Sequence, residues 1–228
     1  LGRLAQRFTP VLMRAGYNST MTGNKRIDSH HVNRVTVYAS SSAALKPVFY
    51  AAAHRLGEIL AAAGKTIVYG ASGHGLMGAL ADAALAGGGE VYGVVPGFLQ
   101  DLELTHERLT GLEVVGSMHM RKQLMLDGSD AVIALPGGCG TIEELFEAIT
   151  MKRLGQWVGP VILVNTDGFY DRLSQFLEHM VAERFMGDRH LEMWTVVDGP
   201  EEVLAALEEA PAWDSSALQY ANVTPANA

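Results

Sequence analysis

The stretch that decides the fold is "DAVIALPGGCGTIEELFEAITMKRLG", residues 130–155. Its first part, 130–136, is a short run of apolar residues, which is typical of a buried strand. Three glycines then surround the chain's only cysteine, and a helical pattern follows at 141–155. A buried strand, a glycine turn and a helix in this order form the unit from which parallel α/β sheets are built.

The same unit recurs along the chain. Apolar runs predict strands at 34–39, 65–70, 90–96, 111–116, 130–136, 159–165 and 194–198. Helical patterns lie between them, at 47–64, 75–89, 117–129, 141–155, 170–186 and 200–210. This alternation predicts one α/β domain of the doubly wound, Rossmann-like type, with a mostly parallel sheet and helices on both faces. Ligands of such sheets bind beyond the carboxyl ends of the strands, which makes candidate site loops of 39–46, 70–75, 96–105, 116–122 and 136–141.

The two ends of the chain differ from this pattern. We expect a flexible N-terminal extension at 1–33, the domain at 34–210 and a loose C-terminal tail at 211–228. The first 27 residues contain five basic residues and no acidic one. They loosely resemble an organelle transit peptide, but an unstructured extension is the interpretation that we favour.

Composition excludes several classes of protein. The formal net charge of −8 argues against binding to a nucleic-acid backbone, which needs clustered Lys and Arg. No apolar run approaches the roughly 18 residues that span a bilayer, so we expect no membrane segment. A single cysteine excludes an internal disulfide and a multi-cysteine zinc site, and it fits a reducing, cytoplasmic compartment.

Two glycine-rich turns could bind phosphate. "YGASGHGLMG", 69–78, contains a formal G-x-G-x-x-G between a strand and a helix. A dinucleotide site also needs an acidic residue at the end of the following strand, and 90–96 ends in Pro96 and Gly97 instead. "PGGCGT", 136–141, lacks the lysine of a Walker A loop, but backbone N–H groups at a helix start still suit a monophosphate.

The start of the helix at 141–155 has two interpretations. Thr141 and Glu144 have the spacing of a capping box, in which each side chain satisfies a free backbone N–H. Glu144 also points away from the apolar stripe of this helix, at the mouth of the glycine turn, where a carboxylate could be catalytic. Glu143, Glu147 and Thr150 share a second, polar face. Cys139 would form a stabilised thiolate there, but no base lies near it in sequence, which disfavours a nucleophile.

A basic pair interrupts the helix predicted at 117–129. Arg121 and Lys122, in "SMHMRKQLM", lie on the same helical face as Met118 and Met125. A basic pair on an apolar face suggests that an anion binds there. Long stems that cover apolar surface while their charges reach water explain the pattern equally well.

Three segments together carry a resemblance to a known family. "SMHMRK", "ALPGGCGTIEELFEAIT" and "GPVILVNTDGFYDRL" closely resemble the Lonely Guy family of cytokinin-activating phosphoribohydrolases, with its P-G-G-x-G-T-x-x-E motif. The resemblance covers about residues 34–198 and implies a Rossmann-like fold and a homodimer or larger oligomer. The implied reaction hydrolyses the N-glycosidic bond of N6-modified AMP, with AMP as a further substrate, to free base and ribose 5-phosphate. No metal or redox cofactor is implied.

The resemblance also implies the site residues. Arg121 and Glu144 would be the catalytic pair. The substrate contacts would be Glu103, Arg121, Lys122, Gly138, Cys139, Gly140, Thr141, Ile142, Glu143, Glu144 and Thr150. The chain departs from the family where "YGASGHGLMG" replaces the common "YGGGSVGLMG", and where Cys139 replaces a frequent tyrosine. The alternative function is a nucleotide-binding or carrier protein on the same scaffold, without hydrolysis. A pyridoxal-dependent decarboxylase lacks support, because no lysine lies in a recognisable cofactor setting.

Overall fold

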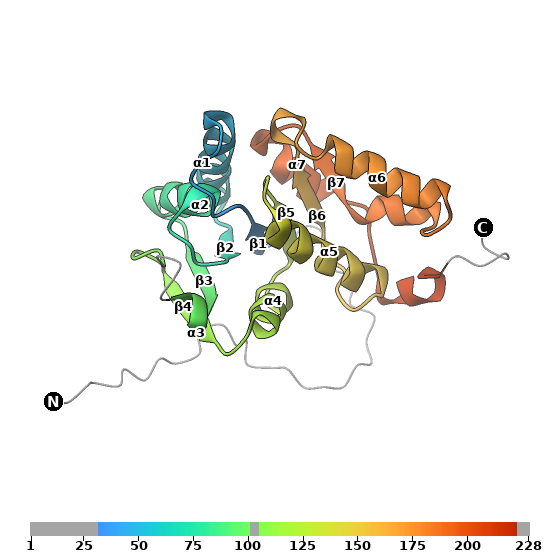
Figure 1. Cartoon of the computed structure of the whole chain (residues 1–228), viewed down its shortest axis with the longest axis horizontal. Helices are drawn as coiled ribbons and strands as arrows, with labels where there is room; N and C mark the ends of the chain where they lie inside the picture. Colours follow the sequence, from blue (N-terminus) through green and yellow to red (C-terminus); the bar gives the residue numbers. More distant parts are fainter. Residues whose placement is uncertain (1–31, 101–104, 223–228) are drawn as a thin grey trace.

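An all-parallel sheet of seven strands runs through the middle of the computed structural model, which describes residues 32–100 and 105–222 (Figure 1). The strands follow the order β4-β3-β2-β1-β5-β6-β7. They are β1 (Arg34–Tyr38), β2 (Thr66–Tyr69), β3 (Val91–Pro96), β4 (Gly111–Val115), β5 (Ala131–Ala134), β6 (Val161–Val164) and β7 (Thr195–Val197). The expected doubly wound α/β architecture is confirmed, and every predicted strand is present.

Helices connect successive strands. The α-helices are α1 (Pro47–Ala62), α2 (Gly75–Ala86), α3 (Gly97–Gln100), α4 (Met118–Asp127), α5 (Cys139–Arg153), α6 (Asp171–Ala182) and α7 (Val203–Glu209). Short 3-10 helices are η2 (Thr166–Gly168), η3 (Asp188–Met193), η4 (Pro200–Glu202) and η5 (Ser215–Tyr220). Most predicted helices are a few residues shorter than expected, whereas α5 begins two residues earlier.

The strand order reverses between β1 and β5. The chain builds outward from β1 through β2 and β3 to β4, and then returns to place β5 on the other side of β1. The register pairs Val35 with Ala131 and Tyr38 with Ala134. The loops that follow β1 and β5 therefore run apart from each other beyond the carboxyl ends of these two strands. Ligands of doubly wound sheets bind at such a point.

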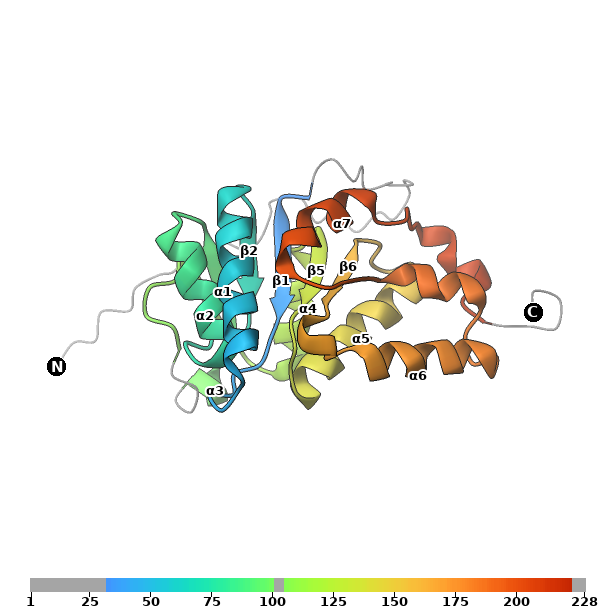
Figure 2. The same cartoon turned by 90° about the horizontal axis from the view of Figure 1, so that it is seen from above.

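Two helical layers cover the sheet. Helices α1, α2 and α7 pack on one face, and α4, α5 and α6 pack on the other (Figures 1 and 2). The inner strands contribute to both cores by alternation: Val37 of β1 lies in the core under α1 and α2, whereas its neighbour Tyr38 lies in the core under α4 and α5. In the described part of the chain, no helix is both long and apolar enough to cross a bilayer.

The C-terminal segment packs against α5 over the residues that the structure describes. Trp213 is 4% exposed, and its indole N–H donates to the carbonyl of Lys152 over 2.7 Å. Arg153 Nε donates to the carbonyl of Ala221 over 2.8 Å. The expectation of a loose tail is therefore wrong for 211–222, because the aromatic anchor outweighs the polar composition around it. Residues 223–228, and 1–31 of the expected extension, lie outside the described residues.

Lys152 is buried beneath this segment, with 1% of its surface exposed. Its ammonium lies 5.9 Å from the ring centre of Trp213. Burial lowers the pKa of Lys152 from its ordinary value of 10.5 to about 8. Folding therefore makes the ammonium form of Lys152 less stable relative to the neutral amine than it is in the unfolded chain.

We expect Lys152→Met to raise the melting temperature at pH 7, because methionine fills a similar volume without a charge to bury. The gain will shrink as the pH rises from about 8 to about 10.5, the range in which the folded lysine has lost its proton and the unfolded one has not. Thermal unfolding of the wild type and the variant at pH 7 and pH 10 measures this difference in melting temperature. A difference that stays constant across this range would contradict a depressed pKa.

Candidate active site

The guanidinium of Arg121 lies across the carboxyl ends of two strands. Its Nε donates to the carbonyl of Val94 in β3, and its Nη2 donates to the carbonyl of Gly70 directly after β2, each over 3.1 Å. A Cβ at Gly70 would lie 1.9 Å from Nη2, so only glycine allows this approach. Arg121 is 6% exposed, and the two carbonyls hold its side chain in one position.

The structure brings the predicted pair Arg121 and Glu144 together. Glu144 comes from the second turn of α5, is 8% exposed, and places Oε1 3.7 Å from Arg121 Nη1. The helical wheel alone predicts an outward carboxylate, but α4 lies over that side of α5. The pair is an ion pair without a direct hydrogen bond, because 3.7 Å exceeds hydrogen-bonding distance.

The surroundings of Glu144 raise the pKa of its carboxyl group toward neutral pH. Burial raises its pKa from 4.5 to about 7, although the charge of Arg121 acts in the opposite direction. The negative charge of Glu143 raises the pKa further. A carboxyl group with this pKa can exist as acid or base near pH 7, which is a common property of catalytic groups.

The glycine turn begins from a fixed strand end. The N–H of Leu135 donates to the carbonyl of Tyr38 over 2.9 Å, and the hydroxyl of Tyr170 donates to the carbonyl of Leu135 over 2.7 Å. Helix α5 then starts at Cys139, with Gly138 as its N-cap residue and no side-chain cap. These contacts join the turn to β1 and to the start of α6.

The predicted capping box is wrong. Thr141 is the third residue of α5 rather than its cap, and Glu144 lies too far along the helix to reach the N-cap. A Cβ at Gly137 would lie 2.1 Å from Thr141 Oγ1, so the threonine side chain folds back over a glycine. Glu144 therefore does not cap α5, and the catalytic role stays a prediction.

The backbone at the start of α5 faces open space. In the part of the chain that the structure describes, no acceptor is found for the N–H groups of Cys139, Gly140 and Thr141. A Cβ at Gly138 or Gly140 would meet no heavy atom within 4 Å. These N–H groups, at the positive end of the helix dipole, are available to an anion.

The other glycine turn is filled by the chain itself. The carbonyl of Ser40 accepts from the N–H groups of Leu76 and Met77, over 2.9 and 3.3 Å, at the start of α2. A pyrophosphate would need these same donors. The segment 69–78 matches the sequence pattern of a dinucleotide fingerprint. However, the N–H groups at the start of α2, which would bind the cofactor, already donate to the carbonyl of Ser40.

The turn at 69–78 is where the chain departs from the family pattern, with Ala71 in place of a common glycine. Ala71 has a φ of 68°, in the left-handed region that favours glycine. Alanine costs about 1 kcal/mol there. The carbonyl of Ala71 accepts from the N–H of His106 over 3.0 Å, which holds the loop in this conformation.

Lys122 connects α4 to α5. Its ammonium contacts Glu143 Oε1 closely and lies 3.2 Å from Glu147 Oε2. Burial lowers the pKa of Lys122, but the two hydrogen-bonded carboxylates outweigh burial, and the pKa is raised overall. The sequence suggested that the basic pair binds an anion or that its long stems cover apolar surface. Neither explanation includes the observed contact, in which two acids of the neighbouring helix balance the charge of Lys122.

The remaining predicted residues lie around this centre. Cys139 and Thr150 are exposed on α5, and Ile142 is half-buried. Glu103 lies outside the described residues. Sequence reasoning missed Gly70 and Glu147 as parts of the arrangement. The available signal for Gly70 was its position directly after a strand. The signal for Glu147 was its position one helical turn after Glu143.

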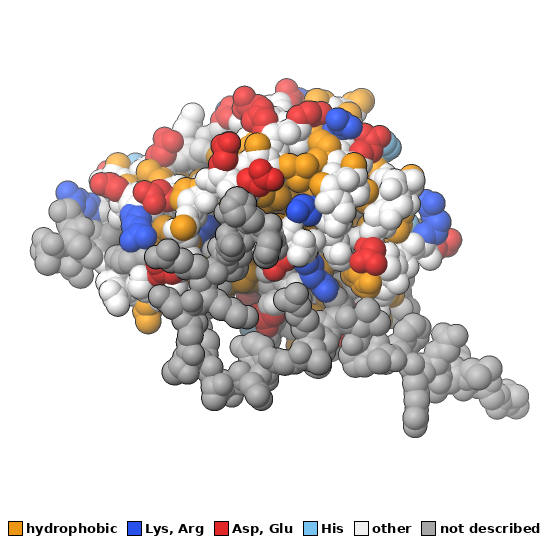
Figure 3. All heavy atoms as spheres, turned by 180° about the vertical axis from the view of Figure 1, so that it is seen from behind, with side chains coloured by type: hydrophobic (Ala, Val, Ile, Leu, Met, Phe, Trp, Pro, Cys, Tyr) orange, Lys and Arg blue, Asp and Glu red, His pale blue; other side chains and the backbone are white. Residues whose placement is uncertain are grey.

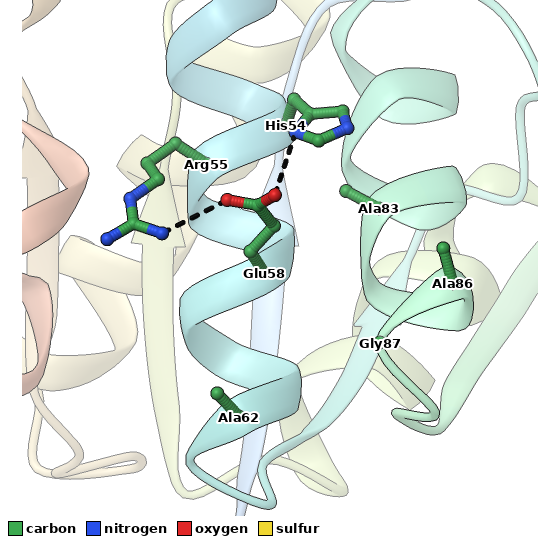
Figure 4. A pocket seen from close by; sticks show the side chains of 7 residues that line it. All are labelled: His54, Arg55, Glu58, Ala62, Ala83, Ala86 and Gly87. Atoms are coloured by element: carbon green, nitrogen blue, oxygen red, sulfur yellow. Dashed lines mark hydrogen bonds and ion pairs between the residues drawn. The ribbon is translucent and has the colours of Figure 1, made fainter.

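A separate hollow of about 390 Å³ lies between α1 and α2 (Figure 4). Its acid, Glu58, already pairs with His54 at 3.6 Å and Arg55 at 3.0 Å. Alanines and a glycine form the rest of the lining: Ala62, Ala83, Ala86 and Gly87. Since α1 and α2 cover the opposite face of the sheet from α4 and α5, this hollow is not part of the Arg121 site. Across the described ranges, no group of three or more His, Cys, Asp or Glu residues could hold a metal ion.

Comparison with solved structures supports the fold. A molybdenum cofactor carrier protein from Chlamydomonas reinhardtii matches with a TM-score of 0.62 and 21% identity, over 79% of this chain and 98% of that one. A molybdenum cofactor binding protein from Rippkaea orientalis matches with a TM-score of 0.60 and 23% identity, over 78% and 96%. Identities this low establish a shared fold alone.

Sequence comparison is more specific. The family model described as "Possible lysine decarboxylase" matches residues 77–207. A probable cytokinin riboside 5′-monophosphate phosphoribohydrolase of Oryza sativa subsp. japonica is 42% identical over 188 residues, covering 82% of this chain and 76% of its own. A cytokinin riboside 5′-monophosphate phosphoribohydrolase of Arabidopsis thaliana is 39% identical over 176 residues, covering 77% and 81%. With identity at this level over most of both chains, and with Arg121 and Glu144 paired in the fold, the chain belongs to the Lonely Guy family of cytokinin riboside 5′-monophosphate phosphoribohydrolases.

Proposed function

We propose that this protein is an N-glycosyl hydrolase that cleaves N6-modified AMP, a cytokinin riboside 5′-monophosphate, and also AMP, to free base and ribose 5-phosphate. The names of its relatives support the substrate class. The observation that carries the proposal is the buried pair of Arg121 and Glu144 beside the open N-terminus of α5.

The burial of Glu144 beside Arg121 and its raised pKa support a catalytic role. Cleavage of an N-glycosidic bond passes through a transition state in which the ribose carries positive charge, and a carboxylate stabilises this charge. The ionised form of Glu144 would face the ribose and orient the attacking water. With a pKa of about 7, the same group can then accept a proton from that water.

Arg121 would act as a fixed cation near the leaving base. Two of its nitrogens are already bound to the carbonyls of Gly70 and Val94. Nη1 lies 3.7 Å from Glu144 Oε1 and 3.8 Å from Met118 Sδ, and it is the atom that would face the substrate. A cation held in place before the reaction stabilises developing negative charge without reorganisation. The adenine could therefore depart with its excess charge partly neutralised.

The glycine turn would hold the 5′-phosphate. Among the described residues the N–H groups at the start of α5 have no acceptor, the space beside Gly138 and Gly140 is open, and Lys122 lies on the neighbouring helix. Glu143 and Thr150 on the polar face of α5, and the half-buried Ile142 beside them, would contact the remainder of the nucleotide. Glu103 keeps the substrate-contact role that the family resemblance implies.

We infer a homodimer or larger homo-oligomer as the working form. Large apolar side chains are exposed on α3, β4 and α4, near the site: Phe98, Val114 and Met120. We infer no nucleic-acid partner, since Lys and Arg are scattered and acidic side chains line the upper edge of the face in Figure 3. The single cysteine supports a cytoplasmic location.

Glu144→Gln tests the catalytic assignment. We expect base release from AMP and isopentenyl-AMP to fall by about 100-fold or more, the usual effect of losing a proton-transferring group. Gln keeps the volume and does not alter a cap, so the variant should fold. Release of base by the variant at near the wild-type rate would refute the role. Intact AMP after long incubation with the wild type would instead support a carrier protein.

The pH profile tests the protonation state. If ionised Glu144 is the active form, kcat/KM for AMP should rise with pH, with a midpoint near the pKa of about 7. The ionised carboxylate is also the less stable buried form, so the wild type should lose stability relative to Glu144→Gln between about pH 4.5 and 7. Rates and unfolding midpoints at matched pH values measure both. Activity that falls as the pH rises through 7 would contradict the ionised role.

Gly70→Ala tests the fixed position of Arg121. The added Cβ would collide with Nη2 and push the guanidinium away from its two carbonyls. We expect kcat/KM to fall by about tenfold or more. The midpoint of the pH profile should rise, because Arg121 lowers the pKa of Glu144.

Gly128→Ala is the matched control. Gly128 follows the other end of α4, where a Cβ would meet its nearest neighbour at an ordinary 3.5 Å. The control should keep the wild-type rate and pH midpoint. Wild-type activity in Gly70→Ala would show that the reaction does not need the guanidinium in its observed position.

A further inference from the structure

Two carboxylates of α5 compete for the ammonium of Lys122. Glu143 and Glu147 lie one helical turn apart on α5, and both contact Nζ. Their side chains differ in exposure, at 56% for Glu143 and 31% for Glu147, whereas Lys122 is only 14% exposed. The ammonium is thus enclosed, with one outer and one inner carboxylate.

This arrangement conflicts with the simplest form of phosphate binding. One positive charge faces two negative charges, so the cluster as a whole repels an approaching dianion. Lys122 can bind a phosphate with net attraction only if it gives up at least one carboxylate. The carboxylate that leaves must be able to return to water at low cost.

Glu143 is the carboxylate that meets this requirement. Ion pairs of exposed groups contribute little stability, so its release costs little. It also lies next to Glu144 and two residues from Thr141, near the start of α5, where the described residues offer no acceptor to the first N–H groups. Glu147 lies one turn further along the helix and is less exposed.

We propose that Glu143 occupies the phosphate-binding position of Lys122 in the free enzyme, and that the 5′-phosphate of the substrate replaces it. Glu147 keeps its contact throughout and holds the ammonium in place. The site then selects for dianionic phosphate, because a neutral nucleoside cannot displace a carboxylate. This inference rests on the proposed function for the identity of the ligand.

Ribose 5-phosphate and adenine, the two products, allow binding to be measured without turnover. Isothermal titration of the full chain at pH 7.5 would compare wild type, Glu143→Gln, Glu143→Asp and Glu147→Gln. We expect Glu143→Gln to bind ribose 5-phosphate about two- to fivefold more tightly, which is the effect of one lost ion pair. Its affinity for adenine should not change.

The other variants separate contact from general charge. Glu143→Asp keeps the charge but shortens the reach, so it should also bind ribose 5-phosphate more tightly. Glu147→Gln should gain less than Glu143→Gln. Glu178→Gln removes an exposed acid of α6 and should match the wild type.

Three results would overturn the proposal: no gain in Glu143→Gln, an equal or larger gain in Glu147→Gln, or an equal gain for adenine. An assay of base release by the wild type separates this inference from the proposed function. A wild type that releases base while Glu143→Gln gains no affinity defeats the exchange alone. A wild type that releases no base, with the expected order of affinities intact, defeats the hydrolase assignment alone.

Discussion

The charge of Arg121 is the constraint on which the site depends. A guanidinium buried to this degree is tolerated only when hydrogen bonds and an opposite charge compensate it. The compensation comes from three separate parts of the chain: the ends of β2 and β3, and the second turn of α5. The buried charge is therefore compensated only when the sheet and both helices are in place.

Helices α4 and α5 meet through two layers of charge. The inner layer, Arg121 with Glu144, is shielded from water, and the charge of Arg121 lowers the pKa of Glu144 against the larger effect of burial. The outer layer, Lys122 with its two acids, is partly solvated and can rearrange. Adjacent residues on each helix thus have different surroundings: Arg121 and Glu144 are buried, whereas Glu143 and Glu147 are partly exposed to water.

Sequence alone predicted the strands and helices well, because buried parallel strands are short apolar runs and glycines mark their ends. The pairing of Arg121 with Glu144 came from the family resemblance and could not come from spacing, since the two residues belong to different helices. The acceptors of Arg121 are backbone carbonyls, which no side-chain pattern reveals. The capping box failed because T-x-x-E looks the same whether the helix starts at Thr141 or at Cys139. The tail was misjudged because one aromatic residue, Trp213, decides its packing.

The carbonyl of Ser40 at the start of α2 has a consequence for how this scaffold could change. It belongs to the main chain, so no side-chain replacement at that position would remove it. Of the two glycine turns, the one before α2 has its helix-start N–H groups bound to Ser40, whereas the described residues offer no acceptor at the start of α5, and the difference lies in the path of the loop after β1. A conversion of this fold to a dinucleotide-binding one would need an inserted or deleted residue in that loop. Point mutation of the glycines in 69–78 would leave the start of α2 bound to Ser40.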